Sequence, residues 1–334
     1  MLDFKHIIGH ENIIQHLKKA ITLDKVSHAY IFAGEDGMGK SMLSDAFALS
    51  LQCEHKKDLL GDACKVCKSC LQGASNNHPD IIKVTHEKAS IGVDDIRIQV
   101  NNDIQIKPYS SPYKIYIIDE AEKLTEQAQN ALLKTIEEPP AYAVVILLTS
   151  NLNVLLATIL SRCVTLKLQQ VDKEKIKEYL MLEYKIPDYL AELSCLFSDG
   201  NVGKAISYAS SEEFQRMKEA ALHLLKNIDD MKVYEIVDEI KSLSEDKDKI
   251  KDYLDFIMLW YRDVLLFKVT KDPNLLTYKN EVIDISKQAS MKSYEGIQNI
   301  IDAIEKAKTR LKANVNFEIA MELMLFTIKE MGHD

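Results

Sequence analysis

The fold is decided by one stretch near the N-terminus, AYIFAGEDGMGKS at residues 29–41. Its first five residues are apolar and predict a buried strand, and the next eight fit the phosphate-binding pattern G-x-x-x-x-G-K-[S/T]. In this pattern backbone amides surround the phosphates, the lysine reaches the β and γ phosphates, and the hydroxyl binds Mg²⁺. An accidental glycine-rich turn is the alternative, which the complete match between a strand and a helix disfavours. The predicted ATP-binding residues are Gly34, Gly37, Gly39, Lys40 and Ser41.

Three further apolar stretches predict strands at residues 115–118, 144–148 and 164–168. Strands that are apolar along their whole length, and that alternate with helical stretches, are typical of a parallel sheet covered on both faces. We therefore expect an α/β nucleotide-binding domain over residues 1–168. After it, the pattern predicts a small helical lid over residues 169–209 and an all-helical domain over residues 210–334.

Two carboxylates, Asp119 and Glu120, directly follow the second predicted strand. Beside a phosphate-binding loop, Asp119 would hold Mg²⁺ through water, and Glu120 would orient or polarise the attacking water as a catalytic residue. The competing interpretation is a pair that caps the helix beginning at Ala121. Both interpretations can hold together, and the nearby phosphate-binding loop favours the functional one.

Four cysteines, Cys53, Cys64, Cys67 and Cys70, have the spacing C-x10-C-x2-C-x2-C. Four thiolates this close in a reducing compartment match a tetrahedral zinc site. An iron–sulfur cluster is the rival, but its sequence pattern requires a fourth cysteine where this chain has Ala74. Four free cysteines would require a coincidence of three spacings. We expect a structural zinc that folds a module at about residues 53–70.

Composition excludes several classes of protein. With 46% hydrophobic residues among 334, the chain is not disordered, and 11 glycines with 7 prolines are too few for an architecture of many tight turns. The net charge of −9 argues against a dedicated nucleic-acid-binding protein. The longest apolar run, residues 143–148, is too short for a signal peptide or a membrane span. A cytoplasmic protein with reduced cysteines and no membrane partner is expected.

Several short motifs resemble the clamp-loader AAA+ family of bacterial DNA polymerase III. SHAYIF at 27–32 leads into the phosphate-binding loop, and NALLKTIEEPP at 130–140 is followed by SRC at 161–163. The delta-prime branch of the family is the more similar one, through NHPD at 77–80, IGVDDIR at 91–97, GNVGKA at 200–205 and WYRD at 260–263. The resemblance implies an AAA+ domain with a helical lid and a helical collar.

The resemblance also implies partners and residue roles. In this family, delta-prime forms a hetero-pentamer with gamma/tau and delta subunits, and the ring uses ATP to place a sliding clamp on primed DNA. The arginine of the SRC motif, here Arg162, enters the ATP site of a neighbouring subunit and acts catalytically in trans. Spacing alone would make Arg162 an ordinary surface ion-pair residue. Ser150 corresponds to the polar sensor that follows the third predicted strand.

One departure from the family pattern concerns ATP hydrolysis. ATPase-active relatives carry Gly-x-x-Arg at the start of the lid helix, where this chain has Gly200 and, at the arginine position, Gly203. The resemblance therefore implies ATP binding with weak or absent hydrolysis, in a component of the polymerase holoenzyme. Two alternatives stay open. A gamma/tau-type ATPase motor subunit is disfavoured by Gly203, and a zinc-stabilised nucleic-acid-binding module with a vestigial nucleotide site is disfavoured by the acidic charge.

Overall fold

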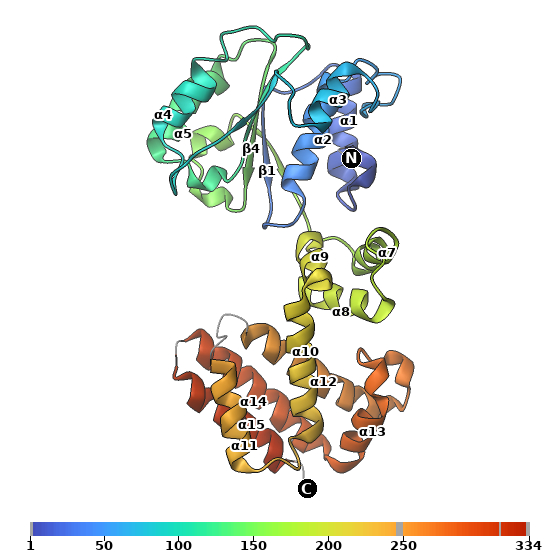
Figure 1. Ribbon diagram of the computed structural model, residues 1–334. Helices are drawn as coiled ribbons and strands as arrows, with labels where there is room; N and C mark the ends of the chain where they lie inside the picture. The colour runs from blue at the N-terminus through green and yellow to red at the C-terminus, as the bar shows by residue number, and fades with distance from the viewer. Residues whose placement is uncertain (1–2, 245–249, 314, 332–334) are drawn as a thin grey trace. The chain divides into compact units, whose positions relative to one another are not determined.

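The structure is a computed structural model that describes residues 3–244, 250–313 and 315–331 (Figure 1). It divides into two compact units. The first holds the chain up to Tyr179 together with Asp199–Lys204, and the second holds Leu180–Ser198 and the chain from Ala205 onward. The division into segments 1–168, 169–209 and 210–334 stays a prediction.

A parallel sheet forms the centre of the first unit. Its strands lie in the order β2-β3-β4-β1-β5, so β1, which leads into the phosphate-binding loop, is flanked by β4 and β5. Their bounds are β1 Ala29–Ala33, β2 Ile81–Val84, β3 Lys114–Ile118, β4 Ala143–Thr149 and β5 Val164–Lys167. The four predicted strands and the α/β fold class are confirmed. Strand β2 was not predicted; it is a four-residue edge strand that carries Lys83 and is only partly buried.

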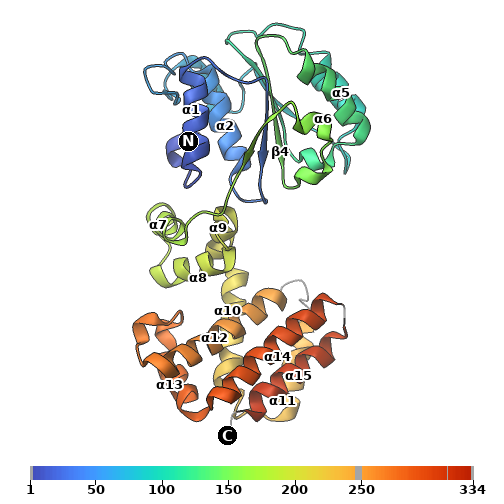
Figure 2. The same cartoon turned by 180° about the vertical axis from the view of Figure 1, so that it is seen from behind.

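Helices cover both faces of this sheet (Figures 1 and 2). Alternate residues of β1 lie on opposite faces of the sheet. Tyr30 and Phe32 pack against α1 and α2, whereas Ala29 and Ile31 pack against α4 and α5. Burial on both sides explains why the three inner strands, β1, β3 and β4, are almost entirely apolar. The helices are α1 Glu11–Thr22, α2 Lys40–Gln52, α3 Lys68–Ala74, α4 Val93–Ile96, α5 Glu126–Glu137 and α6 Ala157–Leu160.

The rest of the described chain is helical. The lid segment contains α7 Lys173–Glu183, α8 Asp188–Ser198 and α9 Val202–Ser210. The C-terminal helices are α10 Glu212–Asn227, α11 Val233–Leu243, α12 Ile250–Thr270, α13 Val282–Met291, α14 Tyr294–Lys312 and α15 Phe317–Glu330. Short helical turns lie at Phe4–His6, Arg97–Asn101, Ala121–Lys123, Leu152–Val154, Pro273–Leu275 and Lys279–Glu281.

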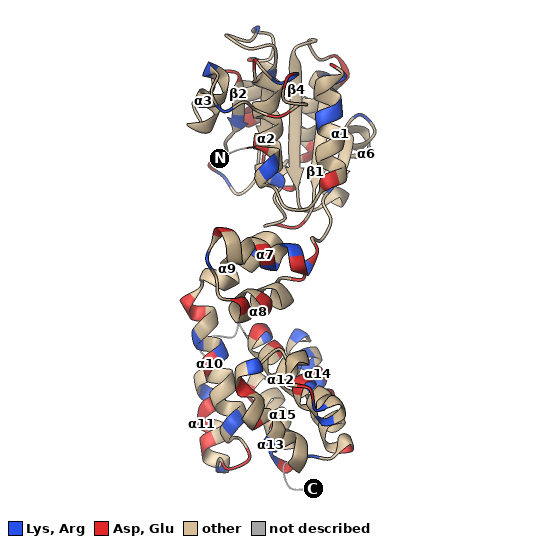
Figure 3. Cartoon of the chain, turned by 90° about the vertical axis from the view of Figure 1, so that its right-hand side faces the viewer, with Lys and Arg blue, Asp and Glu red and all other residues tan. Residues whose placement is uncertain are grey.

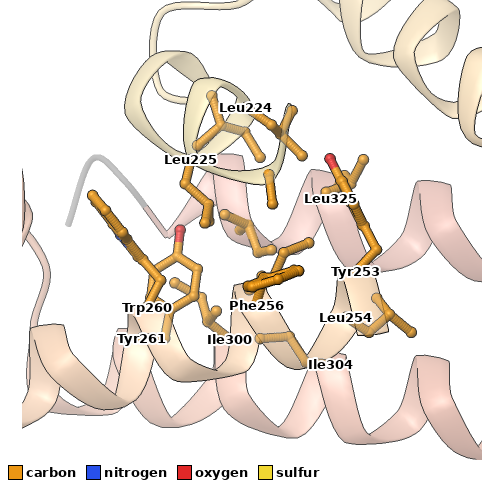
Figure 4. Packing of buried hydrophobic residues seen from close by; sticks show 14 of the residues in the cluster. Leu224, Leu225, Tyr253, Leu254, Phe256, Trp260, Tyr261, Ile300, Ile304 and Leu325 are labelled. Atoms are coloured by element: carbon orange, nitrogen blue, oxygen red, sulfur yellow. The ribbon is translucent and has the colours of Figure 1, made fainter. Parts of the chain in front are cut away.

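The second unit has its own core, in which α12 packs against its neighbours (Figure 4). Trp260 is fully buried, and its indole donates to Oε1 of Gln288 at 2.9 Å. The Gln288 amide donates in turn to the carbonyl of Leu225 at 2.7 Å. The buried indole N–H and both ends of the Gln288 amide are therefore hydrogen-bonded. Outside the core, acidic and basic residues are interspersed on α10 and α11 (Figure 3).

None of the helices within the described ranges is long and apolar enough to cross a membrane.

Candidate nucleotide site and cysteine cluster

The predicted phosphate-binding loop connects β1 to the N-terminus of α2. The amide of Gly34 donates to the carbonyl of Thr149 at 3.1 Å, which fixes the loop to β4. Gly37 and Gly39 have φ of 86° and 92°, values that favour glycine, and Gly39 precedes the first residue of α2. Within the described chain, the amides of Gly39, Lys40 and Ser41 donate no hydrogen bond. Free amides at a helix N-terminus are the groups that bind a phosphate.

Lys40 is held within this loop. Its side chain is 7% exposed, and its Nζ donates to the carbonyl of Gly34 at 2.7 Å and to Oδ1 of Asp36 at 2.9 Å. A phosphate that binds Lys40 would therefore have to replace the Gly34 carbonyl or the Asp36 carboxylate as a partner of its ammonium group. Ser41 Oγ donates to Oδ2 of Asp119 at 3.2 Å. The structure therefore brings together the hydroxyl and the carboxylate that were predicted to surround Mg²⁺.

Glu120 is held by a lysine and a histidine that the sequence did not single out as its partners. Its carboxylate lies 2.7 Å from Nζ of Lys123 and 3.4 Å from Nε2 of His86. The hydrogen bond with Lys123 lowers the pKa of Glu120, so this carboxyl is an anion at neutral pH. Glu120 has φ of 50°, which turns the chain sharply between β3 and the next helical turn. Glu120 thus has the charged form needed to orient water, but Lys123 and His86 would compete with that water for its carboxylate.

Ser150 contacts an acidic residue that the sequence analysis missed. Its hydroxyl and its amide donate to the two carboxylate oxygens of Glu122, at 2.6 Å and 3.2 Å. Burial opposes ionisation of Glu122, yet the hydrogen bonds from Ser150 leave the pKa of Glu122 lowered. Glu122 lies beyond the predicted carboxylate pair and Ser150 follows β4, so only the pairing of β3 with β4 brings them together. The sensor role of Ser150 stays a prediction.

Arg162 directly follows the turn that ends α6. Its Nε lies 2.9 Å from Oε1 of Glu137, and its terminal nitrogen donates to the carbonyl of Thr158 at 3.1 Å and to Oγ of Ser161 at 3.2 Å. These partners belong to α5, to α6 and to the residue that follows α6, rather than to the phosphate-binding loop. The side chain is 41% exposed, so its guanidinium is accessible from outside this chain. Its catalytic role stays a prediction.

The four predicted cysteines converge on one point. Their sulfur atoms all lie within 4.8 Å of one another, and the Sγ atoms of Cys64 and Cys70 are 3.8 Å apart. Sulfurs bound tetrahedrally to zinc at about 2.3 Å are separated by about 3.8 Å, so the donor set fits that metal. Four cysteines in this arrangement can hold a metal ion. Cys53 directly follows α2 and Cys67 directly precedes α3. The cluster therefore links the end of one helix to the start of the other.

Amide groups of the same segment favour the thiolate of Cys64, whereas burial raises the pKa of Cys53 and of Cys70. The amides of Cys64 and Cys67 donate to the sulfurs of Cys53 and Cys64, both at 3.3 Å. Burial opposes ionisation, yet backbone hydrogen bonds from Val66 and Cys67 lower the pKa of Cys64 to about 6. Metal ions bind cysteine as the thiolate, so Cys64 is the ligand of this cluster that ionises most readily.

The comparisons with known proteins agree with this architecture. Two family models match: "DNA polymerase III, delta subunit" at residues 9–172, and its C-terminal counterpart at residues 215–330. The DNA polymerase III subunit delta' of Bacillus subtilis is 30% identical over 323 residues, 95% of each chain. The chain belongs to the DNA polymerase III delta-prime family. The predicted resemblance is thereby confirmed.

The chain is also similar to tau and gamma subunits of DNA polymerase III. The tau subunit of Bacillus subtilis is 27% identical over 99% of this chain, which spans 62% of the tau sequence. Among solved structures, a DNA polymerase III gamma subunit-related protein of Thermotoga maritima is 21% identical, with a TM-score of 0.41 over 97% of this chain and all of that one.

Proposed function

We propose that this chain is the delta-prime subunit of a bacterial DNA polymerase III clamp loader, which uses ATP to place a sliding clamp on primed DNA. The observation that carries the proposal is the 30% identity to a delta' subunit along 95% of both chains. The expected partners are gamma/tau and delta subunits in a hetero-pentamer, working in the cytoplasm where DNA is replicated. Residues 1–168 would be the AAA+ domain, 169–209 the lid and 210–334 the collar.

The chain itself would bind ATP with Mg²⁺ at residues 34–41. Unpaired amides at the start of α2 would contact the phosphates, Lys40 would neutralise them, and Ser41 with Asp119 would hold the ion. Hydrolysis by the isolated chain should be weak, because Gly203 stands where active relatives carry the lid arginine. Glu120 could then orient the attacking water, but the lid arginine that would stabilise the charge of the transition state is absent at position 203.

Arg162 would act on the nucleotide of a neighbouring subunit. A guanidinium offers a planar fork of donors that suits phosphate oxygens, and its charge is permanent. Both side chains of the ion pair that holds Arg162 to Glu137 are more than 40% exposed, and exposed pairs contribute little free energy. A phosphate group of a neighbour can therefore replace Glu137 at small cost.

The four cysteines would hold one structural zinc. All four positions are protein ligands, which is typical of a structural rather than a catalytic zinc. Beyond the cluster, Asp62 accepts from Nζ of Lys18 at 2.9 Å, which ties the module to α1.

Reconstitution tests this proposal. Clamp loading onto primed DNA should require this chain in a mixture with gamma/tau and delta subunits, and the chain alone should show ATP binding with little turnover. The gamma/tau-type motor is the second candidate, favoured by the identity to tau over 99% of the chain. Rapid ATP turnover by the isolated chain would shift the assignment of its role toward that motor subunit.

A further inference from the structure

The first residues of α9 lie directly on the phosphate-binding loop. The amide of Gly203 donates to the carbonyl of Gly37 at 2.8 Å. The side-chain amide of Asn201 donates to the carbonyl of Asp36, also at 2.8 Å. All four residues belong to the first unit. Two consecutive carbonyl groups of the loop are thus bonded from the lid segment.

This contact requires glycine on both sides. A Cβ at Gly203 would lie 2.6 Å from Cα of Gly37 and 2.7 Å from its carbonyl oxygen. A Cβ at Gly37 would lie 2.6 Å from Oδ1 of Asn201, and the φ of 86° at Gly37 also disfavours a side chain. An arginine at position 203 would therefore break the contact. Gly203 replaces an arginine side chain with a bond between two backbones.

The side-chain amide of Asn201 makes one hydrogen bond through its nitrogen and one through its oxygen. It is 2% exposed, and while its Nδ2 donates to Asp36, its Oδ1 accepts from the amide of Lys204 at 3.1 Å. The second bond caps the N-terminus of α9. One buried side chain thus joins the start of the lid helix to the loop, with both of its polar groups satisfied.

A third carbonyl of the loop is held from another side. Nε2 of His10 lies 3.1 Å from the carbonyl oxygen of Met38, and burial lowers the pKa of His10, so a neutral ring donates this bond. In a trans peptide the carbonyl and the following N–H point in opposite directions. Holding the carbonyl oxygens of Asp36 and Met38 therefore directs the amides of Gly37 and Gly39 to the opposite side, where a phosphate can reach them.

We propose that Asn201 and Gly203 are positioning residues of the nucleotide site, which hold the loop in its phosphate-binding conformation by fixing its carbonyl groups from the lid side. The ligand class is the polyphosphate of a nucleoside triphosphate. This inference rests on the proposed ATP binding, and it gives the segment that lacks the lid arginine a role in binding rather than in hydrolysis.

The test compares two serine variants of the full chain by titration with a fluorescent ATP analogue and Mg²⁺. Asn201→Ser keeps a residue that caps helices well, but serine is too short to reach the carbonyl of Asp36. Losing one such hydrogen bond should weaken nucleotide binding about fivefold to tenfold. The matched control is Asn316→Ser at the cap of α15, where Oδ1 accepts from the amide of Ile319 at 3.0 Å. The control should leave the dissociation constant unchanged.

Amide hydrogen exchange supplies a second readout. Because binding and positioning are reciprocal, Mg-ATP should slow exchange at the Gly203 amide in the unaltered chain, and less so in Asn201→Ser. Equal or tighter ATP binding by Asn201→Ser would overturn the inference, the tighter result meaning that the lid holds the site closed. Absence of ATP binding by the unaltered chain is a different result, which refutes the proposed nucleotide site and this inference with it.

Discussion

At the scale of single residues, Asp36 competes for the charge of Lys40. Its carboxylate accepts from Nζ at 2.9 Å but is 89% exposed, so the pair contributes at most about 1 kcal/mol. Asp36→Ala removes this competitor and a negative charge beside the phosphates, and should tighten Mg-ATP binding up to about fivefold. Isothermal titration measures it, with Asp94→Ala, which removes another exposed carboxylate, as the control. Weaker binding would show that Asp36 helps to hold the nucleotide.

Arg162 is the residue whose substitution should affect a neighbour rather than its own chain. Arg162→Ala should leave this chain's ATP affinity and thermal stability unchanged, while the assembled complex loses ATP turnover at one site, by roughly 10³-fold or more if the arginine acts as in GTPases. Arg162→Lys should be nearly as poor, because lysine lacks the planar fork. Glu137→Gln removes the ion-pair partner and should retain activity. Full ATP turnover by complexes with either arginine variant would contradict the catalytic role and leave Arg162 as an ordinary surface ion-pair residue.

At the scale of elements, the cysteine cluster links α2 to α3 and, through Asp62, to α1. Protein purified without added metal should contain about one zinc per chain, measured by elemental analysis. Cys67→Ser should abolish retention and destabilise this segment, since zinc binding supplies roughly 10 kcal/mol to small modules of this kind. Cys163→Ser, at a cysteine outside the cluster, is the control. Retention of zinc by Cys67→Ser, or iron in its place, would contradict the assignment.

At the scale of the whole molecule, two units with separate cores should unfold separately. Ile300→Ala in the core of the second unit should cost about 2–5 kcal/mol and shift one calorimetric transition. Leu132→Ala, equally buried in the core of the first unit, should shift the other. Metal chelation should affect the transition that Leu132→Ala affects, because the cysteines belong to the first unit. One transition moved by all three treatments would contradict independent units.

Local sequence patterns determined most of this fold. Strands β1, β3 and β4 were predictable because burial on both faces makes them almost entirely apolar. Strand β5 is a partly buried edge strand that carries Lys167, and it was predicted from Val164, Leu166 and Leu168. The phosphate-binding loop and the cysteine spacing are contained within short segments. Strand β2, at the opposite edge, is also four residues long and carries Lys83, and it was missed although its pattern is similar to that of β5.

The pairings around the candidate site were decided by the tertiary structure alone. Ser150 meets Glu122 through the register of β3 and β4, and His86 meets Glu120 across two loops. The contact of Gly203 with Gly37 joins residues far apart in the chain and involves two backbones, which leave no side-chain pattern to recognise. A glycine in the sequence records only that a side chain is absent. What occupies that space depends on which distant segment the fold brings against it.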